Sequence, residues 1–128
     1  MAKTSSSKKA KGCRLEKEIA KLYARKLFPR ATRMPMSGAM QYHKGDIFKG
    51  VYDEWVDECK NQEKVKLWEW WQQAKDQCGH YQKPLLHISR NYSENLTVMR
   101  TDDYFELRET IADLQQTISE LEKIKEEK

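Results

Sequence analysis

The sequence predicts an α/β fold with a mixed β-sheet flanked by helices and a long C-terminal helix. Three observations indicate this class. Runs of strand character alternate with segments of helical periodicity. A chain of 128 residues is long enough to bury the core of one domain, and the apolar residues after position 106 repeat with heptad spacing. Four Trp, six Tyr and three Phe argue against a disordered chain, although 34% of the residues are charged.

The charge is distributed unevenly along the chain. The first 100 residues hold 20 Lys and Arg against 11 Asp and Glu, whereas residues 101–128 hold 4 against 9. A basic body indicates a polyanionic partner such as nucleic acid, and a solvated surface is the alternative. No apolar run approaches the roughly 20 residues that cross a bilayer, so no membrane partner is expected. The three cysteines lack Cys-x-x-Cys spacing and no secretory signal is evident, so we expect free thiols in the cytoplasm.

The N-terminal part divides into a predicted arm and a predicted helix. Residues 1–11 are small, polar and basic and are expected to be flexible. Residues 12–28 show helical periodicity, with Leu15 and Ile19 on an apolar arc and basic residues opposite. Glu16 falls inside that arc, where a carboxylate is costly unless it is paired. Its place in the first turn would also allow it to reach solvent or to favour the helix dipole.

The middle of the chain alternates between strands and one helix. The predicted elements are a strand at 30–34, a β-hairpin from Asp46 to residue 60 with the turn KGVYD, a helix at 65–78, and strands at 84–89 and 96–101. Trp68 and Trp71 share a helical stripe with Ala74, a pattern that favours packing in the core over stacking on nucleic-acid bases.

The C-terminal residues 103–128 are predicted to form a separate amphipathic helix after a core of residues 12–102. Its apolar residues are spaced alternately four and three apart: Leu107, Ile111, Leu114, Ile118 and Leu121. This is a heptad seam with charged flanks. Because the seam is narrow, it favours self-association of two chains into a homodimer, and folding back on the body is the alternative.

The segment VDECKNQ holds the candidate chemistry. Strand alternation places Glu58 and Lys60 on one face, and Asp46 opens the neighbouring strand. Two carboxylates beside an open position suit Mg²⁺ or Mn²⁺, to which the backbone carbonyl of Cys59 and the inward-facing Glu16 could add ligands, the latter directly or through water. A lysine there can orient or deprotonate the attacking water. The alternative is an exposed ion pair of little energetic value.

One acidic residue does not fit this register. Asp57 falls on the same strand face as Trp55 and Cys59, which we expect to be buried.

Four segments resemble the PD-(D/E)XK nuclease superfamily, and more narrowly the archaeal-type Holliday junction resolvases and their phage relatives. They are KGCRLEKEIAKLY (Lys11 to Tyr23), RMPMSGAMQYHKGDI (Arg33 to Ile47), ECK (58–60) and PLLHISRN (84–91). The resemblance spans roughly residues 11–105 and implies a restriction-endonuclease-like fold. It does not include the heptad helix.

The resemblance also implies a function. Matching positions make Glu16, Asp46, Glu58 and Lys60 the active residues, with Ser37 preceding the aspartate. The implied reaction is metal-dependent phosphodiester hydrolysis that leaves a 5′-phosphate, performed by a dimer that nicks two strands of branched DNA. Rival interpretations are a nicking, restriction-like or repair nuclease on duplex DNA, and a non-catalytic DNA-binding dimer.

Candidate DNA contacts are basic and polar residues near these segments, for each of which a solvated surface role is the alternative. They are Lys8, Lys9, Lys11, Arg33, Ser37, Lys44, Gln62, Arg90 and Asn91.

Overall fold

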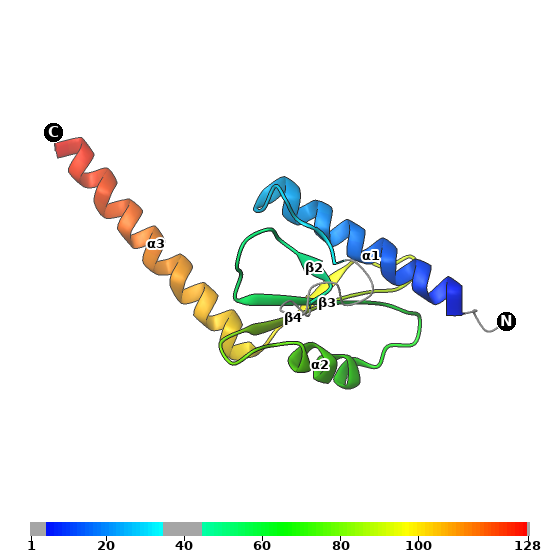
Figure 1. Cartoon of the computed structure of the whole chain (residues 1–128). Helices are drawn as coiled ribbons and strands as arrows, with labels where there is room; N and C mark the ends of the chain where they lie inside the picture. Colours follow the sequence, from blue (N-terminus) through cyan, green and yellow to red (C-terminus); the bar gives the residue numbers. More distant parts are fainter. Residues whose placement is uncertain (1–4, 35–44, 128) are drawn as a thin grey trace. The chain divides into compact units, whose positions relative to one another are not determined.

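The computed structural model describes residues 5–34 and 45–127. The chain forms two compact units, Met1–Val98 and Met99–Lys128. The first unit contains α1 (Ser5–Lys26), β1 (Thr32–Arg33), β2 (Ile47–Phe48), β3 (Trp55–Asn61), α2 (Leu67–Asp76), β4 (Lys83–Ser89) and β5 (Leu96–Val98). The second contains α3 (Thr101–Glu127). Within the first unit, α1 and α2 lie on opposite sides of β3 and β4 (Figure 1).

The mixed sheet of the predicted α/β fold is present as β3-β4-β5. Strands β3 and β4 are parallel, with Glu58 opposite Leu86 and Lys60 opposite Ile88. Strand β5 runs antiparallel to β4. A parallel pair needs a crossover connection, which α2 supplies between β3 and β4. The Glu58 and Lys60 side chains therefore stand on a strand that is fixed by a neighbour and a covering helix.

The predicted hairpin between Asp46 and residue 60 is wrong in its pairing. Strand β2 pairs antiparallel with β1, not with β3. The link to β3 turns away at Gly50, whose φ of 80° lies in the left-handed region that favours glycine. A backbone hydrogen bond from Asp46 N to Asp57 O, 2.8 Å long, still holds the start of β2 against β3.

Gly45 allows this close approach of two backbone segments. A Cβ atom at this position would lie 2.9 Å from Val56 Cγ1 and 3.1 Å from the Asp57 carbonyl oxygen. These separations are shorter than ordinary van der Waals contacts, so a larger residue would push Asp46 away from β3.

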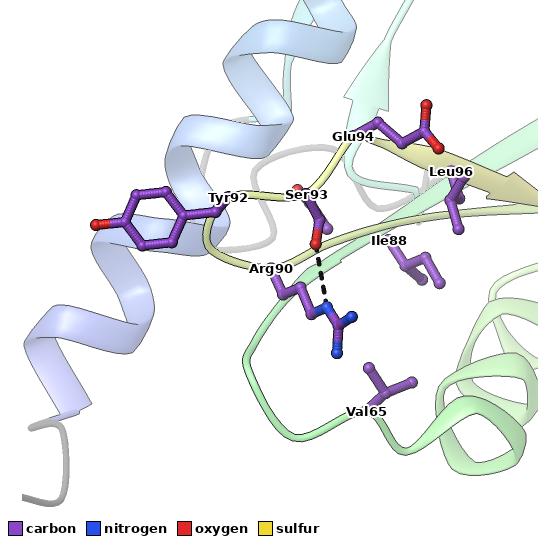
Figure 2. A pocket seen from close by; sticks show the side chains of 8 residues that line it. Val65, Ile88, Arg90, Tyr92, Ser93, Glu94 and Leu96 are labelled. Atoms are coloured by element: carbon purple, nitrogen blue, oxygen red, sulfur yellow. Dashed lines mark hydrogen bonds between the residues drawn. The ribbon is translucent and has the colours of Figure 1, made fainter.

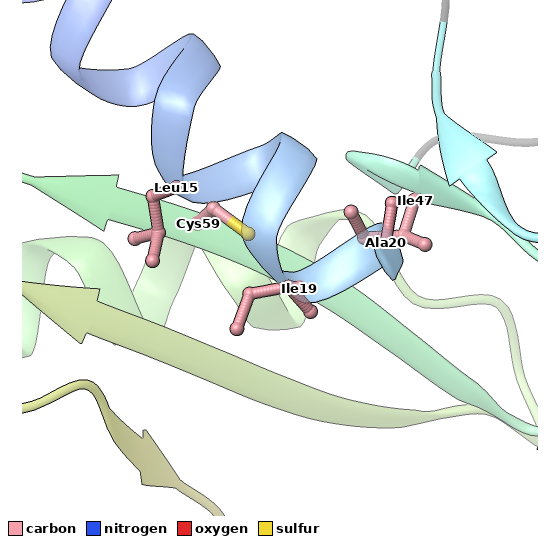
Figure 3. Packing of buried hydrophobic residues seen from close by; sticks show 5 residues of the cluster. All are labelled: Leu15, Ile19, Ala20, Ile47 and Cys59. Atoms are coloured by element: carbon pink, nitrogen blue, oxygen red, sulfur yellow. The ribbon is translucent and has the colours of Figure 1, made fainter. Parts of the chain in front are cut away.

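Helix α1 begins at Ser5, earlier than predicted, so the described part of the expected flexible arm is helical. A tertiary contact explains the extension: Lys11 is buried, its ammonium lies 3.0 Å from Glu63, and its carbonyl accepts a hydrogen bond from Asn61. Further along, Leu15, Ile19 and Ala20 pack with Ile47 and Cys59 into one apolar cluster (Figure 3). That cluster joins α1, β2 and β3.

The buried face of helix α2 differs from the predicted tryptophan stripe. Trp70 and Ala74 are buried against Leu86 of β4, with Trp71 partly buried beside them. Trp68 is 80% exposed, so its predicted place in the core is wrong. Residues 70 and 74 are one helical turn apart, and Trp68 lies about 160° round the helix from Trp70 at 3.6 residues per turn, so it faces solvent when Trp70 faces the sheet.

The second unit is dominated by α3, whose 27 residues include the whole predicted heptad seam. Its apolar side chains are between 40% and 59% exposed: Leu107, Ile111, Leu114, Ile118, Leu121 and Ile124. Within the part of the chain that the structure describes, none of the helices is long and apolar enough to cross a membrane.

The apolar cluster under α1 gives a stability prediction. Leu15 is 1% exposed whereas Leu22, on the same helix, is 37% exposed. We expect Leu15→Ala to lower the free energy of unfolding by about 2–5 kcal/mol through lost burial and a residual cavity, and Leu22→Ala to lower it by less than about 1 kcal/mol. Urea denaturation followed by circular dichroism measures both. Equal losses would contradict the packing of α1 described here.

Candidate active site

Asp46 lies beside the middle of β3. Its carboxylate oxygen Oδ2 accepts a hydrogen bond of 2.7 Å from the backbone N–H of Cys59. Its own backbone N–H donates to Asp57 O, and its carbonyl accepts from Met34 N at 2.7 Å. Backbone contacts on both sides therefore hold Asp46 against the strand that carries Glu58 and Lys60.

Glu58 and Lys60 stand on one face of β3, as strand alternation predicts. Lys60 Nζ lies 3.6 Å from Glu58 Oε1. Glu58 is buried and Lys60 is partly buried. The two side chains therefore do not form the exposed ion pair that was the alternative. Their burial excludes much of the water that screens charges at a protein surface.

Glu16 reaches the edge of the same region from α1. Its Oε2 accepts a 3.0 Å hydrogen bond from Arg33 Nε, and the side chain is partly buried. The paired guanidinium of Arg33 explains how a carboxylate is tolerated on the inward arc of the helix. The hydrogen bond to Glu16 in turn raises the pKa of Arg33. Burial is the main cause of the raised pKa values of Asp46 and Glu58, and the negative charge of Glu16 adds to it.

The surroundings of Asp46 and Glu58 disfavour the ionised form of both side chains. Burial raises the pKa of Asp46 to about 6, against the lowering effect of the Cys59 N–H hydrogen bond. Burial, and then the charge of Asp46, raises the pKa of Glu58 to about 7, which Lys60 partly offsets. Two repelling carboxylates in a poorly solvated place are the environment in which a bound cation is most stabilising.

The residues fit a hard divalent cation through two carboxylates rather than a complete cage. Over residues 5–34 and 45–127, no cluster of three or more His, Cys, Asp or Glu side chains could hold a metal ion. Mg²⁺ commonly keeps several waters and binds through one or two protein carboxylates together with substrate phosphate oxygens. Asp46 and Glu58 meet that requirement, and the Cys59 carbonyl remains a predicted ligand.

Cys59 itself has no nucleophilic role in this geometry. It is buried in the apolar cluster with Leu15 and Ile19, and burial raises the pKa of its thiol far above the ordinary value. A buried thiol with a raised pKa is unreactive.

The surroundings of Asp57 explain why an acidic residue stands on the buried face of β3. It points to the buried face, as predicted, and is 0% exposed. Three side chains contact its carboxylate: Lys49 Nζ at 2.5 Å, Tyr23 OH at 2.5 Å and His87 Nε2 at 2.6 Å. Burial alone would raise the pKa of Asp57, but the hydrogen bond from His87 and the charge of Lys49 outweigh it and lower the pKa.

These three partners were not predicted from the sequence as part of any site. Tyr23 offered a signal, because it places a hydroxyl on the apolar arc of the first helix. His87 offered another, as a polar residue inside the apolar run PLLHIS. Lys49 lies in the predicted turn KGVYD and carried no comparable signal.

The predicted DNA-contact residues have different surroundings. Lys8, Lys9, Arg90 and Asn91 are exposed, and Gln62 is partly buried. Lys11 is buried and paired with Glu63, and Arg33 is paired with Glu16, so neither offers an open surface cation. Ser37 and Lys44 lie outside the described residues.

A cavity of about 470 Å³ lies at the end of β4, next to the site strand (Figure 2). Its apolar side is formed by Val65, Ile88 and Leu96. Arg90 extends toward Val65, and its Nε donates a 3.0 Å hydrogen bond to Ser93 Oγ. Because Ile88 is the cross-strand partner of Lys60, this cavity borders the strand position of the predicted catalytic lysine.

Comparison with known proteins identifies a matching family. A family model described as "Phage putative PDDEXK endonuclease" matches residues 7–128. The matched region includes α3, which the resemblance to junction resolvases did not cover. No curated protein and no solved structure matches the chain.

The raised pKa values predict how stability depends on pH when divalent cations are removed by EDTA. The carboxyl groups of Glu58 and Asp46 hold their protons more tightly in the folded protein than in the unfolded chain. Their pKa values in the unfolded chain are 4.5 for Glu58 and 3.8 for Asp46. Stability contributed by these groups is therefore lost as pH rises from about 4 to 7. We expect Glu58→Gln to be more stable than the wild type by roughly 1–3 kcal/mol at pH 8, with little difference at pH 4.

Thermal or urea unfolding at both pH values measures this effect. Glu69→Gln, an exposed carboxylate on α2, is the matched control and is expected to leave the pH dependence unchanged. A Glu58→Gln protein that is less stable than the wild type at pH 8 would contradict the electrostatics of the site.

Proposed function

The chain belongs to the phage PDDEXK endonuclease family, and from this premise we propose that it is a Mg²⁺-dependent endonuclease that hydrolyses phosphodiester bonds in branched DNA. The observation that carries the proposal is a pair of carboxylates, the partly buried Asp46 and the buried Glu58, with raised pKa values beside Lys60. An ordinary surface of a DNA-binding protein has no need for such a destabilising pair.

Each residue has a distinct role in the proposed reaction. Asp46 and Glu58 hold the divalent cation, for which Mn²⁺ is expected to substitute, and Glu16 supports the site from α1. When bound, the cation supplies Lewis-acid stabilisation of charge on the phosphate. Lys60 Nζ, 3.6 Å from Glu58, orients or deprotonates the attacking water and stabilises charge in the transition state. The oxygen of the water forms a bond to phosphorus while the bond from phosphorus to the 3′ oxygen breaks. One product carries the 5′-phosphate, and the leaving oxygen takes up a proton to become the 3′-hydroxyl of the other.

The substrate proposal rests on two supports. The four sequence segments resemble Holliday junction resolvases, and the first 100 residues carry an excess of basic side chains. Exposed Lys8, Lys9, Arg90 and Asn91 are the proposed phosphate contacts, with Gln62 nearer the scissile bond. Duplex DNA is the alternative substrate for the same chemistry. We place this activity in the cytoplasm, where Cys13, Cys59 and Cys78 remain reduced.

Substitution of the site separates catalysis from binding. We expect Asp46→Asn, Glu58→Gln and Lys60→Ala each to reduce the cleavage rate of a four-way junction in Mg²⁺ by at least about 10²-fold, because each removes a group that acts in the transition state. Junction affinity, measured by fluorescence anisotropy in EDTA, should change less than about threefold.

A matched control is Glu54→Gln, which neutralises an exposed carboxylate next to the same strand. It should cut at the wild-type rate. If the three site variants also cut normally, the assignment of the catalytic residues is wrong. If the wild type binds junctions but shows no divalent-dependent cleavage, the chain is a DNA-binding protein without this activity.

We further propose that the enzyme is a homodimer joined through α3. The seam places Ile111 and Ile118 at the heptad a positions and Leu107, Leu114 and Leu121 at the d positions. Isoleucine at a with leucine at d favours a coiled coil of two parallel helices. The exposure of these side chains in one chain supports the proposal, since a stripe of five large apolar residues is costly to leave in water.

One charge in the seam tests the dimer. We expect Leu114→Lys to convert the dimer to a monomer, because two ammonium groups would meet in the apolar interface. Gln116→Lys adds the same charge to the outer face of α3 and should leave the dimer intact. Light scattering after size-exclusion chromatography measures the mass. A Leu114→Lys protein that remains dimeric would move the interface to the first unit.

A further inference from the structure

The buried cluster around Asp57 is not used by the proposed reaction. Its carboxylate is fully buried and contacts Lys49, Tyr23 and His87. The Lys49 ammonium lies within 2.7 Å of three oxygens, which belong to Asp57, Asp53 and the Trp55 backbone. The ammonium donates hydrogen bonds to Asp53 Oδ2 and to the Trp55 carbonyl, and its contact with Asp57 Oδ1 is an ion pair.

The cluster continues beyond the carboxylate. The second ring nitrogen of His87, Nδ1, lies 2.9 Å from Thr97 Oγ1 on β5. Lys49 Nζ also lies 4.9 Å from the centre of the Tyr23 ring, a cation–π distance. One carboxylate on β3 is thus linked to α1, to the residue that follows β2, to β4 and through it to β5.

The elements joined by Asp57 are the elements that carry the candidate active site. Helix α1 carries both Tyr23 and Glu16. The chain around β2 carries Lys49 and Asp46, and β3 carries Asp57 next to Glu58. The hydrogen bond from Asp46 N to Asp57 O connects the two sets directly. A shift of Asp57 would therefore change the separation of the Asp46 and Glu58 carboxylates.

Stability alone is a weak reason for such a cluster. Taking several ionisable groups out of water carries a large desolvation cost, and apolar residues of similar volume often stabilise a fold equally well. The same face of β3 already contains Cys59 packed among apolar side chains. Hydrogen bonds and ion pairs differ from apolar contacts in that they fix direction as well as distance.

We propose that Asp57, held by Lys49, Tyr23 and His87, is a positioning residue that sets the spacing of Asp46 and Glu58 for the divalent cation. This role rests on the proposed function of the site. The cluster touches neither DNA nor the cation and acts only through the placement of β2 and β3. Its loss should therefore weaken cation binding while leaving DNA affinity unchanged.

The test uses variants that alter the cluster without leaving a buried charge unpaired. Asp57→Asn would remove the one carboxylate charge that both Lys49 and His87 face in the buried cluster. It is expected to unfold the protein, so it is unsuitable. Tyr23→Phe keeps the ring and removes one hydrogen bond to Asp57. Thr97→Val keeps the shape of the side chain and removes the contact with His87. Leu86→Val, in the apolar cluster under α2, is the control for general destabilisation.

The primary readout is Mn²⁺ affinity of the full-length protein without DNA, measured by electron paramagnetic resonance. We expect Tyr23→Phe to weaken Mn²⁺ binding about tenfold and Thr97→Val about threefold, with Leu86→Val within twofold of the wild type. The Mg²⁺ concentration for half-maximal junction cleavage should rise in the same order, and cleavage at saturating Mg²⁺ should recover. Junction affinity in EDTA should be equal for all four proteins.

Three results would overturn the proposal. Equal Mn²⁺ affinities of Tyr23→Phe, Thr97→Val and the wild type would remove the positioning role and leave the nuclease assignment standing. A wild-type protein that neither binds Mn²⁺ nor cuts any junction would overturn the proposed function and the positioning role together. A loss of affinity in Leu86→Val as large as in Tyr23→Phe would reduce the cluster to a general contribution to stability.

Discussion

The arrangement of this protein depends most on the contacts of one fully buried carboxylate, that of Asp57. Its partners come from α1, from the end of β2 and from β4. These segments lie far apart in the sequence, so a tertiary contact is needed to bring them together. Burial makes the ion pair and hydrogen bonds strong, because little water competes for them, and it makes the loss of any one partner expensive.

The candidate active site is the opposite electrostatic case, only one residue away. Asp57 has its charge compensated and its pKa lowered, whereas Glu58 has its charge opposed by burial and by Asp46, with a raised pKa. Strand alternation separates the two environments across β3. A stable anchor on one face and an unstable carboxylate pair on the other are consistent with a site that gains stability when it binds a cation.

The sequence predicted the parts of this arrangement that depend on local periodicity. Alternation on β3 correctly paired Glu58 with Lys60, and helical periodicity placed Leu15 and Ile19 in the core. The features that sequence alone missed depend on distant contacts. The pairing of β2 with β1, and the partners of Asp57, require a knowledge of which segments meet.

The errors have a common physical cause. Trp68 and Trp70 are equally apolar, and only the orientation of α2 on β4 decides which is buried. The segment before residue 12 is polar enough to be disordered alone, but Lys11 is held by Glu63 and Asn61. In each case tertiary contact decides between local alternatives of similar energy.

The most direct measurement of the central claim is a cleavage panel with the wild-type protein on four-way junction, flap, duplex and single-stranded DNA, each in Mg²⁺ and in EDTA. The account predicts cleavage that requires Mg²⁺ and is fastest on the four-way junction; the absence of divalent-dependent cleavage on every substrate would contradict it.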